Sequence, residues 1–592
     1  MRPFISPPEP SVKSAVPEAG VSATVLPFRS RKRGRRSIPP ASETQPDTSP
    51  SPEGLSAEAT AGQRQAFADL AAFCCAKNPD SAFHLLTGYA GTGKTWLVSA
   101  LVRLCREKRL TVAVCAPTHK AVSVIRQKLE EVGIEPDFLG TLHALLGVRL
   151  KDGPNGVYLQ YLARNPDRRY FESYDVVFID EASMVNAEHL GFMRDAVRKG
   201  GTRVVGIGDP GQLLPVVRED PEGEAAAPLS PQADLFAEES ESPTFEPPLF
   251  LLGAPRAHLT DIVRQRSAED AVHPIIQLSQ EIRRYIEGEA PGVFDAEAIR
   301  RYCARQPQAF AQHVKIQSAD RITQGATQVT AKYVSQKDIH VIAWRNAAVG
   351  RHNHAIHKGL AARYGMAPGH RAFGDPFWPE EIMVAREALY GFRPEDRMRD
   401  QEPPVWEQAL ESSRKVEEED ETVRPQAASG PRGVLIPNNT EMVVRSCRKV
   451  SHPYLGIPCW LIAGYLPKMG ILEFFVAIKP SAHTALRSAA WQQYGRLKWA
   501  IEAHPPRKGR DDPRQKDLEI LFNRAWAIQR ACAPVIHEYA MTAHKSQGST
   551  FTHALVDVAD LLGAVDKGDV NTYHRALYVA VTRAQERVWL CL

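Results

Sequence analysis

A glycine-rich turn is the first stretch of the sequence that could do chemistry. Residues 85–98 read LLTGYAGTGKTWLV, in which Gly88, Gly93, Lys94 and Thr95 fit the pattern G-x-x-x-x-G-K-[ST]. An apolar run precedes the turn and an amphipathic run follows it, so the turn should connect a strand to a helix. This context predicts a loop that binds the phosphates of a nucleoside triphosphate.

Each residue of the turn has an expected role. The glycines Gly88, Gly91 and Gly93 let backbone N–H groups close around phosphate oxygens, and the following helix adds its positive end. Lys94 should supply positive charge to the β- and γ-phosphates, and Thr95 should place its hydroxyl on Mg²⁺. ATP and Mg²⁺ are therefore the expected cofactors.

Polar residues that end two further apolar runs could complete the site. In VVFIDEAS, Asp180 could hold Mg²⁺ through water, and Glu181 could orient and deprotonate the attacking water. The same acidic pair could instead cap the next helix. In GIGDPGQLLPV, Gln212 could contact both the γ-phosphate and the water, or it could be a polar turn residue.

Alternating strands and helices must position these residues. Strands are predicted at 83–87, TVAVCAPT, YDVVFIDEAS and TRVVGIGD, with helices at 94–107 and from the second strand to about residue 132. This alternation predicts an α/β fold with a parallel sheet covered by helices on both faces. Strand and helix patterns recur near the end of the chain, and the short strands EMVVRS, CWLIAGYL and ILEFFVAIK interrupt them. The fold class is therefore two α/β domains, the second carrying a β-rich insertion.

The chain of 592 residues is too long for one hydrophobic core, so several units are expected. Shifts in composition set the boundaries between them. The predicted units are a disordered, basic and Pro-rich tail at 1–58, a first α/β domain at 59–218 with a hairpin insertion at 147–171, an acidic insertion at 219–248, a second α/β domain at 249–394 and 530–592, an acidic linker at 395–433, and a β-rich insertion at 434–529.

Composition narrows the setting in which the protein works. The nine cysteines contain no C-x-x-C pair, which fits reduced thiols in a cytosolic or nuclear compartment. No apolar run is long enough to span a bilayer, so no membrane partner is expected. The basic run RSRKRGRR at 29–36 could be a solvated charge run, a nucleic-acid-binding tail or a nuclear import signal. Localisation is expected to be cytoplasmic and nucleoid-associated in a bacterial or viral source, and nuclear in a eukaryotic one.

The order of the motifs resembles that of superfamily-1 helicases, especially the RecD-like and Dda-like group that moves 5′ to 3′. The resemblance runs from residue 59 to the end of the sequence and rests on TAGQRQAF, GYAGTGKT, APTHKA, GTLHALLG, DEAS, GDPGQLLPV, LTDIVRQR, YAMTAHKSQGST and LYVAVTRAQ. The family's third motif often reads Leu-Pro-Pro, where this chain has Leu213-Leu214-Pro215, a departure that leaves Gln212 in place.

The resemblance implies two RecA-like domains that close on one nucleotide. It assigns recognition of adenine to Gln63, and sensing of the γ-phosphate to Gln547 and Gly548. It also assigns Arg264 and Arg583 as arginine fingers that stabilise the transferring phosphoryl group. Either arginine could instead form a surface salt bridge. The β-rich insertion takes the position of the family's SH3-like insertion.

A track for single-stranded DNA across both domains is also implied. The side chains expected along it follow strand ends and suit contact with phosphates, and they are Thr118, His119, Lys120, Thr141, His143, Thr542, His544 and Lys545. The stretch VRLKDGPNGVYLQYL at 148–162 predicts a β-hairpin where relatives carry a pin that splits the duplex. Tyr158 or Tyr161 could stack on the last base pair, or these tyrosines could simply pack the hairpin.

The expected activity is therefore that of an ATP-dependent DNA helicase moving 5′ to 3′ on single-stranded DNA, with the direction implied by the resemblance alone. Two alternatives stay open: a translocase that remodels its track without unwinding, and an ATP-gated subunit of a recombination or nuclease complex. Single-stranded and forked DNA are the expected partners, with replication or recombination proteins as further candidates and a monomeric motor as the expected state.

Overall fold

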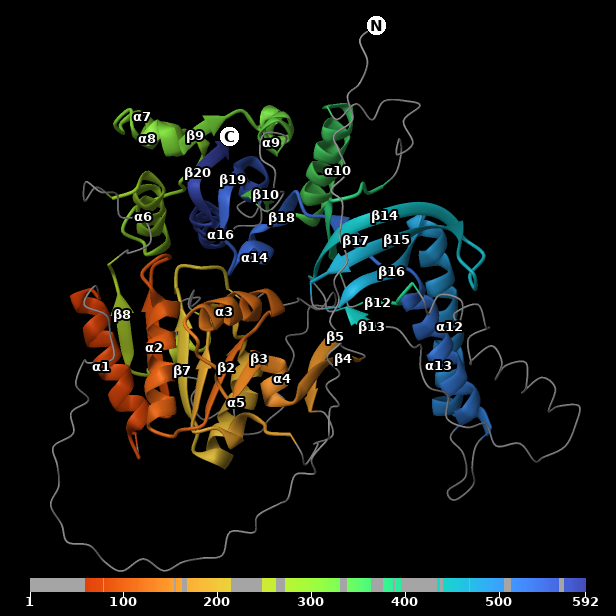
Figure 1. Ribbon diagram of the computed structural model, residues 1–592, viewed down its shortest axis with the longest axis horizontal. Helices are drawn as coiled ribbons and strands as arrows, with labels where there is room; N and C mark the ends of the chain where they lie inside the picture. Colours follow the sequence, from red (N-terminus) through yellow and green to blue (C-terminus); the bar gives the residue numbers. More distant parts are fainter. Residues whose placement is uncertain are drawn as a thin grey trace, which may run out of the picture. The chain divides into compact units, whose positions relative to one another are not determined.

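The computed structural model describes residues 59–77, 79–153, 156–161, 168–214, 247–261, 272–330, 338–363, 376–386, 389–394, 434–436, 440–467, 469–504, 513–563 and 569–592. The predicted tail, the acidic linker and nearly all of the acidic insertion lie outside these residues. The described residues all belong to one compact unit and contain three sheets of five or six strands (Figure 1).

The first sheet is parallel and has the strand order β3-β2-β6-β7-β1-β8. Its central strands are buried along nearly their whole length, so side chains on both faces need cover. The strands are β1 (Phe83–Gly88), β2 (Val112–Ala116), β3 (Phe138–Thr141), β6 (Val176–Ile179), β7 (Arg203–Gly208) and β8 (Arg256–Leu259).

Helices cover both faces of this sheet, as expected. Three share a hydrophobic core with one face, and they are α1 (Ala61–Cys75), α2 (Lys94–Glu107) and α3 (His119–Glu131). The opposite face packs against α4 (Leu142–Leu146) and α5 (Ala187–Gly200). Between α4 and β6 the chain forms a two-stranded hairpin of β4 (Val148–Gly153) and β5 (Gly156–Tyr161), which confirms the predicted hairpin (Figure 1).

The second sheet is also parallel, in the order β18-β10-β19-β20-β9. Its strands are β9 (Val314–Gln317), β10 (Ile339–Ala343), β18 (Ala540–Thr542), β19 (Phe551–Asp557) and β20 (Ala584–Cys591). One core beside the sheet contains residues of α6 (Pro274–Ile286), α7 (Ala296–Ala304), α8 (Phe310–His313), α14 (Ala543–Ser546), α15 (Val558–Leu561) and α16 (Val570–Thr582). A second core contains residues of α9 (Ile322–Thr330) and α10 (Asn346–Arg363).

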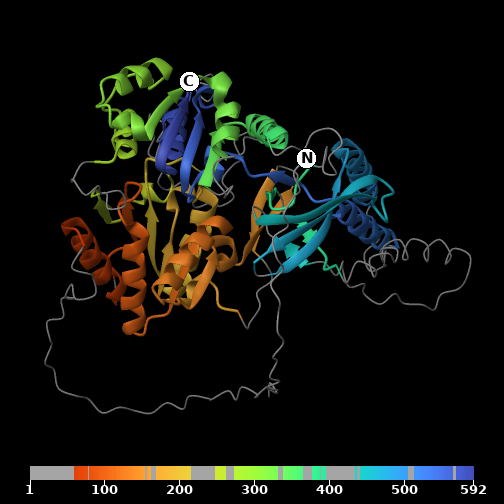
Figure 2. The ribbon, with the colours of Figure 1, turned by 45° about the horizontal axis from the view of Figure 1, so that its top comes forward.

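The third sheet is antiparallel, in the order β16-β15-β14-β11-β17. Its strands are β11 (Ile382–Ala385), β14 (Glu441–Ser451), β15 (Pro458–Leu466), β16 (Gly470–Ala477) and β17 (Val535–His537). Two short strands, β12 (Leu389–Gly391) and β13 (Val434–Ile436), pair with each other and fall between β11 and β14 in the sequence. Two long helices, α12 (Pro480–Ala503) and α13 (Pro513–Ala531), run side by side after β16 (Figure 2).

Two predicted domain boundaries are wrong. The second domain was predicted to begin at 249, but β8 pairs with β1 in the first sheet. This strand has only four residues, alternately exposed and buried, so it leaves no apolar run in the sequence. The β-rich insertion was predicted at 434–529, but its sheet also includes β11 and β17, and two helices fill much of its length.

Among the described residues, no helix combines the length and the apolar character needed to cross a lipid bilayer.

The carboxylate of Asp560 fixes the end of β10 in the second domain. It accepts hydrogen bonds from the backbone N–H groups of Trp344 and Arg345, both at 2.8 Å, and from Arg345 Nε at 2.6 Å. Asp560→Ala should destabilise this domain by about 3 kcal/mol, because it leaves these donors without their charged acceptor. A lower melting temperature and faster hydrogen exchange at the amides of residues 344 and 345 would be measured.

The control is Asp320→Ala, which removes an exposed aspartate from the same domain. Equal melting temperatures for the two variants would contradict the role given to Asp560.

Candidate functional site

The predicted phosphate loop connects β1 to the first turn of α2. Gly91 and Gly93 both have φ of 84°, a left-handed conformation that disfavours any residue with a side chain. At Gly88 a Cβ atom would lie only 2.7 Å from the carbonyl oxygen of Leu259 on β8. The glycines are therefore required for the loop to turn and to lie close to its neighbouring strand.

The ammonium group of Lys94 is bound to the loop itself. Its Nζ donates to the carbonyl oxygens of Gly88 at 2.7 Å and Tyr89 at 2.8 Å. Burial lowers the pKa of Lys94, and three nearby carboxylates oppose that shift. To contact a phosphate, the ammonium group has to leave these two carbonyl oxygens.

Gln63 ties α1 to the phosphate loop. Its Oε1 accepts from the backbone N–H of Thr60, and its Nε2 donates to the carbonyl oxygen of Thr92, both at 3.0 Å. A Cβ at Gly93 would lie 2.6 Å from Nε2, so the amide and the loop fit closely. Gln63 also lines the cavity beside the loop, and its contact with adenine stays a prediction.

The acidic pair lies at the carboxyl end of β6, beside the loop. Glu181 has φ of 53°, which is uncommon for a residue with a side chain, and its backbone N–H donates to Asp180 Oδ1 at 2.9 Å. Its side chain makes no capping hydrogen bond to the turn that follows, which argues against the helix-capping alternative. Burial and the Asp180 carboxylate raise the pKa of Glu181 to about 7, and burial raises the pKa of Asp180.

Residues from both α/β domains line one cavity of about 380 Å³. The first domain contributes the phosphate loop, Asp180, Glu181 and Gln212, and the second contributes Gly548 and Arg583. A Cβ at Gly548 would lie 3.4 Å from Glu181 Oε1, so the two domains approach closely at the acidic pair. The structure thus brings together the predicted phosphate, metal and water-activating groups.

Arg583 is buried, with 5% of its surface exposed. Its guanidinium donates to the carbonyl oxygens of Ser549 and Val579 and to Thr582 Oγ1, at 3.0–3.1 Å. These contacts and its burial exclude the alternative of a surface salt bridge. Arg264, the other predicted arginine finger, lies outside the described residues.

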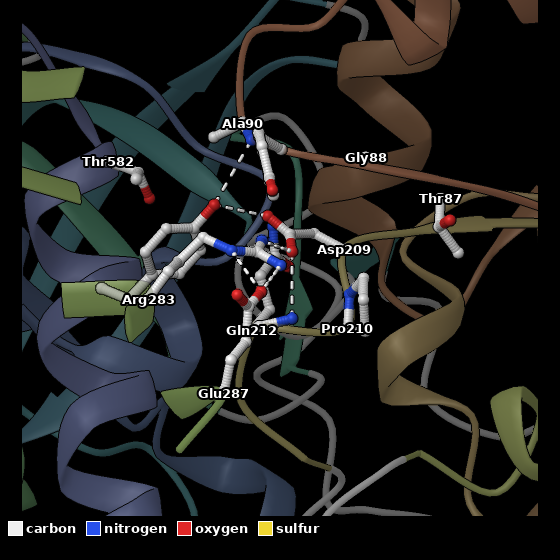
Figure 3. Close-up of polar contacts among 12 residues, drawn as sticks. Thr87, Gly88, Ala90, Asp209, Pro210, Gln212, Arg283, Glu287 and Thr582 are labelled. Carbon is white, nitrogen blue, oxygen red and sulfur yellow. Dashed lines mark hydrogen bonds and ion pairs between the residues drawn. The ribbon is translucent and has the colours of Figure 1, made fainter. Parts of the chain in front are cut away.

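A buried ionic cluster connects the two domains beside this cavity, and we call it the Asp209 cluster (Asp209, Arg283, Glu287 and Tyr578). Asp209 Oδ1 accepts from Arg283 Nη1 at 2.7 Å, and Asp209 Oδ2 accepts from the Tyr578 hydroxyl at 2.6 Å (Figure 3). Arg283 also donates to Glu287 Oε1, and its guanidinium lies 4.1 Å from the ring centre of Tyr89 in the phosphate loop. Asp209 comes from the first domain, whereas Arg283 lies on α6, Glu287 directly follows α6 and Tyr578 lies on α16.

The same cluster reaches the phosphate loop. The backbone N–H of Ala90 donates to the Tyr578 hydroxyl at 3.4 Å. Burial opposes the charge on Arg283, but Asp209, Tyr578 and Glu287 together raise the pKa of its guanidinium. The Arg283 guanidinium therefore keeps its positive charge although it is buried between the two domains.

Further contacts join the turn after β7 to the second domain. Arg575 of α16 donates to the carbonyl oxygens of Pro210 and Gln212. Gln547 Nε2 donates to Gln212 Oε1 at 3.2 Å. Four side chains of the second domain thus contact the turn GDPGQ, and they are Arg283, Gln547, Arg575 and Tyr578. Gln212 and Gln547, both predicted as site residues, are hydrogen-bonded directly.

Sequence reasoning missed Asp209 and Arg283. Asp209 stands in the quoted motif, but only its neighbour Gln212 was given a role. In the sequence EIRR, Arg283 and Arg284 are adjacent arginines that no motif distinguishes. The helical period nevertheless places them on different sides of the helix. Arg283 follows Ser279 by one turn on the buried side of α6, whereas Arg284 is exposed. A charge on the apolar side of an amphipathic helix was the available signal.

The predicted DNA contacts occupy equivalent positions after three strands. Thr118, Thr141 and Thr542 each begin a helix and accept a hydrogen bond from the backbone N–H three residues later, at 3.2, 3.2 and 3.3 Å. Three hydroxyls thus have a structural role as helix caps.

The neighbouring side chains differ in their surroundings. His119 is exposed, whereas His143 lies 3.2 Å from a ring nitrogen of His189, and burial lowers the pKa of His544 to about 4. Burial also lowers the pKa of Lys545. Contact of this whole group with DNA stays a prediction.

Lys120 contacts two acidic residues, Glu441 at 3.5 Å and Glu538 at 3.7 Å. In this arrangement its ammonium group joins α3 to the strand β14 and to the residue after β17. Binding of a phosphate by Lys120 would have to compete with these carboxylates.

The two tyrosines predicted as a wedge, Tyr158 and Tyr161, both lie on β5. The side chain of Tyr158 lies outside the described residues. The ring of Tyr161 is 40% exposed and meets the ring of Phe192 on α5 edge to face, with centres 4.6 Å apart. This contact supports packing of the hairpin as one role of Tyr161, and a wedge role stays a prediction.

Two RecA-like domains thus share one P-loop cavity, to which the second domain contributes Gly548 and Arg583. Over parts of its length the chain is similar to superfamily-1 helicases of the RecD and Pif1 kinds. Residues 58–235 match the model of an AAA domain, and residues 537–591 match that of a UvrD-like helicase C-terminal domain.

Two curated relatives match parts of the chain. An ATP-dependent RecD2 DNA helicase of Deinococcus radiodurans is 32% identical over 207 residues, which is 35% of this chain and 22% of the relative. The RecBCD enzyme subunit RecD of Haemophilus influenzae is 30% identical over 154 residues, 23% of this chain and 22% of the relative. The chain thus matches about a fifth of the length of these relatives.

Solved structures of Pif1 helicases are also similar. One from Bacteroides in complex with ADP-AlF3 and single-stranded DNA has a TM-score of 0.40 at 14% identity, covering 90% of this chain and 92% of that one. One from Candida albicans has a TM-score of 0.39 at 14% identity, covering 90% and 94%.

The adjacent arginines of α6 give a matched test of the Asp209 cluster. Arg283→Gln should lower kcat/KM for ATP at least about tenfold, equivalent to about 1.4 kcal/mol, because Asp209 is then buried without its cation beside the phosphate loop. Steady-state ATPase rates over a range of ATP concentrations would measure this.

Arg284→Gln is the control, because its side chain is 52% exposed and pairs with Glu281 at the surface. It should change kcat/KM little, since exposed ion pairs contribute only about 0–1 kcal/mol. Indistinguishable kinetics for the two variants would show that the buried pair has no part in the site.

Proposed function

We propose that the protein is an ATP-dependent DNA helicase that moves 5′ to 3′ on single-stranded DNA. The observation that carries this proposal is the shared cavity, in which the phosphate loop and acidic pair of one RecA-like domain face Arg583 and Gly548 of the other. Closing and opening such a cavity converts hydrolysis into relative movement of two domains. The names of the matched relatives agree with helicase activity.

The chemistry of the cavity fits a magnesium–nucleoside triphosphate complex. Backbone N–H groups at the start of α2 and the Lys94 ammonium group would bind the phosphates. Thr95 and Asp180 supply the oxygen ligands that Mg²⁺ prefers, and the bound ion would offset the charge of the phosphates. Glu181 would take the proton of the attacking water, and Arg583 would stabilise charge on the γ-phosphoryl group.

Coupling to the DNA would run through the turn GDPGQ. Gln212 lines the cavity and contacts Gln547, and Gln547 follows the short helix that Thr542 caps. A change at the γ-phosphate can therefore reach a predicted DNA-contacting segment through one pair of amides. Single-stranded and forked DNA are the proposed partners, and the direction of movement rests on the family resemblance.

Substitutions in the cavity test the ATPase site. Lys94→Ala should abolish DNA-stimulated ATP hydrolysis, because the β- and γ-phosphates lose their cation. Glu181→Gln should still bind ATP but hydrolyse it roughly 10²- to 10⁴-fold more slowly, the usual contribution of a general base. Lys108→Ala, at the far exposed end of α2, is the control and should behave as wild type. Normal turnover by either cavity variant would remove that residue from its role.

Strand displacement tests the movement. Duplexes with a single-stranded tail at the 5′ or the 3′ end are mixed with protein, ATP and Mg²⁺, and release of the labelled strand is followed. Unwinding should require the 5′ tail. Unwinding only from 3′ tails would reverse the proposed direction, and ATP hydrolysis without unwinding of either substrate would favour the translocase alternative.

A further inference from the structure

Away from the nucleotide cavity, three side chains of metal-binding type meet where the β-rich sheet joins the second α/β domain. His357 lies on α10, Glu381 directly precedes β11, and His537 ends β17. One ligand atom from each residue lies within 4.8 Å of the other two. Glu381 lies where the chain enters the β-rich sheet, and His537 lies where the chain leaves it. The cluster therefore includes a residue from each of the two chain segments that connect the sheet to the second α/β domain.

The carboxylate of Glu381 is buried and held in place from several sides. Its Oε1 lies 2.9 Å from His357 Nδ1 and accepts a hydrogen bond from the Tyr539 hydroxyl. Its Oε2 accepts from the backbone N–H of Trp378 at 2.7 Å. Outer hydrogen bonds of this kind orient the carboxylates that bind metals in proteins.

His537 has the arrangement of an imidazole that is ready to bind a cation. Its Nε2 is buried without a hydrogen-bond partner and lies 3.8 Å from Glu381 Oε2. The ring hydrogen-bonds to the backbone of Pro376, and this bond falls to Nδ1 because Nε2 has no partner. A backbone acceptor on Nδ1 leaves the lone pair on Nε2, facing a carboxylate oxygen. Two facing acceptors repel each other unless a cation lies between them.

Aromatic rings surround the cluster and limit access of water. The ring of His357 stacks on Trp378 with centres 4.1 Å apart, and Phe377 lies 4.4 Å from the ring of His537. In such surroundings an uncompensated carboxylate is costly, and a bound cation gains more than it would in water.

We propose that His357, Glu381 and His537 bind one divalent transition-metal ion of the Zn²⁺ type. Two imidazole nitrogens and one carboxylate oxygen are a ligand set of zinc, whereas Mg²⁺ and Ca²⁺ prefer oxygen ligands. Zinc bonds of about 2.0–2.2 Å place tetrahedral ligands about 3.4 Å apart. His357 Nδ1 and Glu381 Oε1 are already 2.9 Å apart, so ion binding requires the other separations, which reach up to 4.8 Å, to contract by up to about 1.4 Å. The fourth position falls to water.

The bound ion would connect α10 to both chain segments that lead to the β-rich sheet. Asn353, one turn earlier on α10, already accepts hydrogen bonds from the backbone N–H groups of Tyr539 at 3.0 Å and Ala540 at 2.8 Å. The metal would therefore strengthen the attachment of α10 to the segment after β17, which these hydrogen bonds already hold. This role is independent of the nucleotide cavity and of the proposed helicase activity.

The test uses the full chain. Protein is treated with a chelator, returned to metal-free buffer containing Mg²⁺ to occupy oxygen-ligand sites, and titrated with Zn²⁺ or Co²⁺. Wild type should retain one Zn²⁺ per chain by elemental analysis, show the visible absorption of tetrahedral Co²⁺, and melt at a higher temperature with the metal. A chelator-treated wild type that takes up neither ion would overturn the proposal without any variant.

Variants then assign the ligands. Glu381→Gln and His537→Gln should each weaken Zn²⁺ binding by more than about 100-fold, since even outer partners of metal ligands are worth about 10- to 100-fold. The control is His354→Gln, which removes an exposed histidine one turn before His357 on the same helix and should leave binding unchanged. Zn²⁺ retained equally by Glu381→Gln, or lost equally by His354→Gln, would contradict this ligand set.

Discussion

The buried carboxylate of Asp209 is the constraint around which the two RecA-like domains are arranged. It is fully buried, and its charge is balanced by Arg283 from the second domain. A charge that is left buried without its partner typically costs about 3–5 kcal/mol, so a small opening that parts Asp209 from Arg283 before water reaches them is unfavourable. Movement between them is therefore expected to turn about the Asp209 cluster while more weakly held contacts, such as that between Gln212 and Gln547, are exchanged.

The phosphate loop shows how a binding site remains ordered through its own contacts. The Lys94 ammonium group donates to carbonyl oxygens of the loop, and Gln63 connects the loop to α1. The Tyr578 hydroxyl accepts from the backbone N–H of Ala90. The Lys94 ammonium group and the Ala90 N–H are donors that a phosphate could otherwise engage. A nucleotide must exchange these bonds rather than order a flexible loop, which limits the entropy lost on binding.

The sequence allowed most of the cavity to be predicted, because its residues lie in short motifs at strand ends. Lys94, Asp180 and Glu181 meet as expected, since parallel strands deliver their carboxyl ends to one edge of a sheet. Arg583 lies between α16 and β20 of the other domain and lines the same cavity. Arg283 was missed because its partner lies 74 residues away in the chain and no local pattern pairs them. The strand β8 was missed because four residues carry too little periodicity, and the site of His357, Glu381 and His537 because its ligands come from three separated segments.

The three threonine caps have a consequence for what can lie beside them. A hydroxyl has one proton to give and can accept through its lone pairs. In Thr118, Thr141 and Thr542 the oxygen already accepts from a backbone N–H, which leaves the proton and one lone pair for an outside group. A surface built from such caps would donate its hydroxyl protons to a row of acceptor oxygens on the ligand. Every nucleotide presents such oxygens identically through its phosphate. Indifference to base sequence would then follow from how the helices begin.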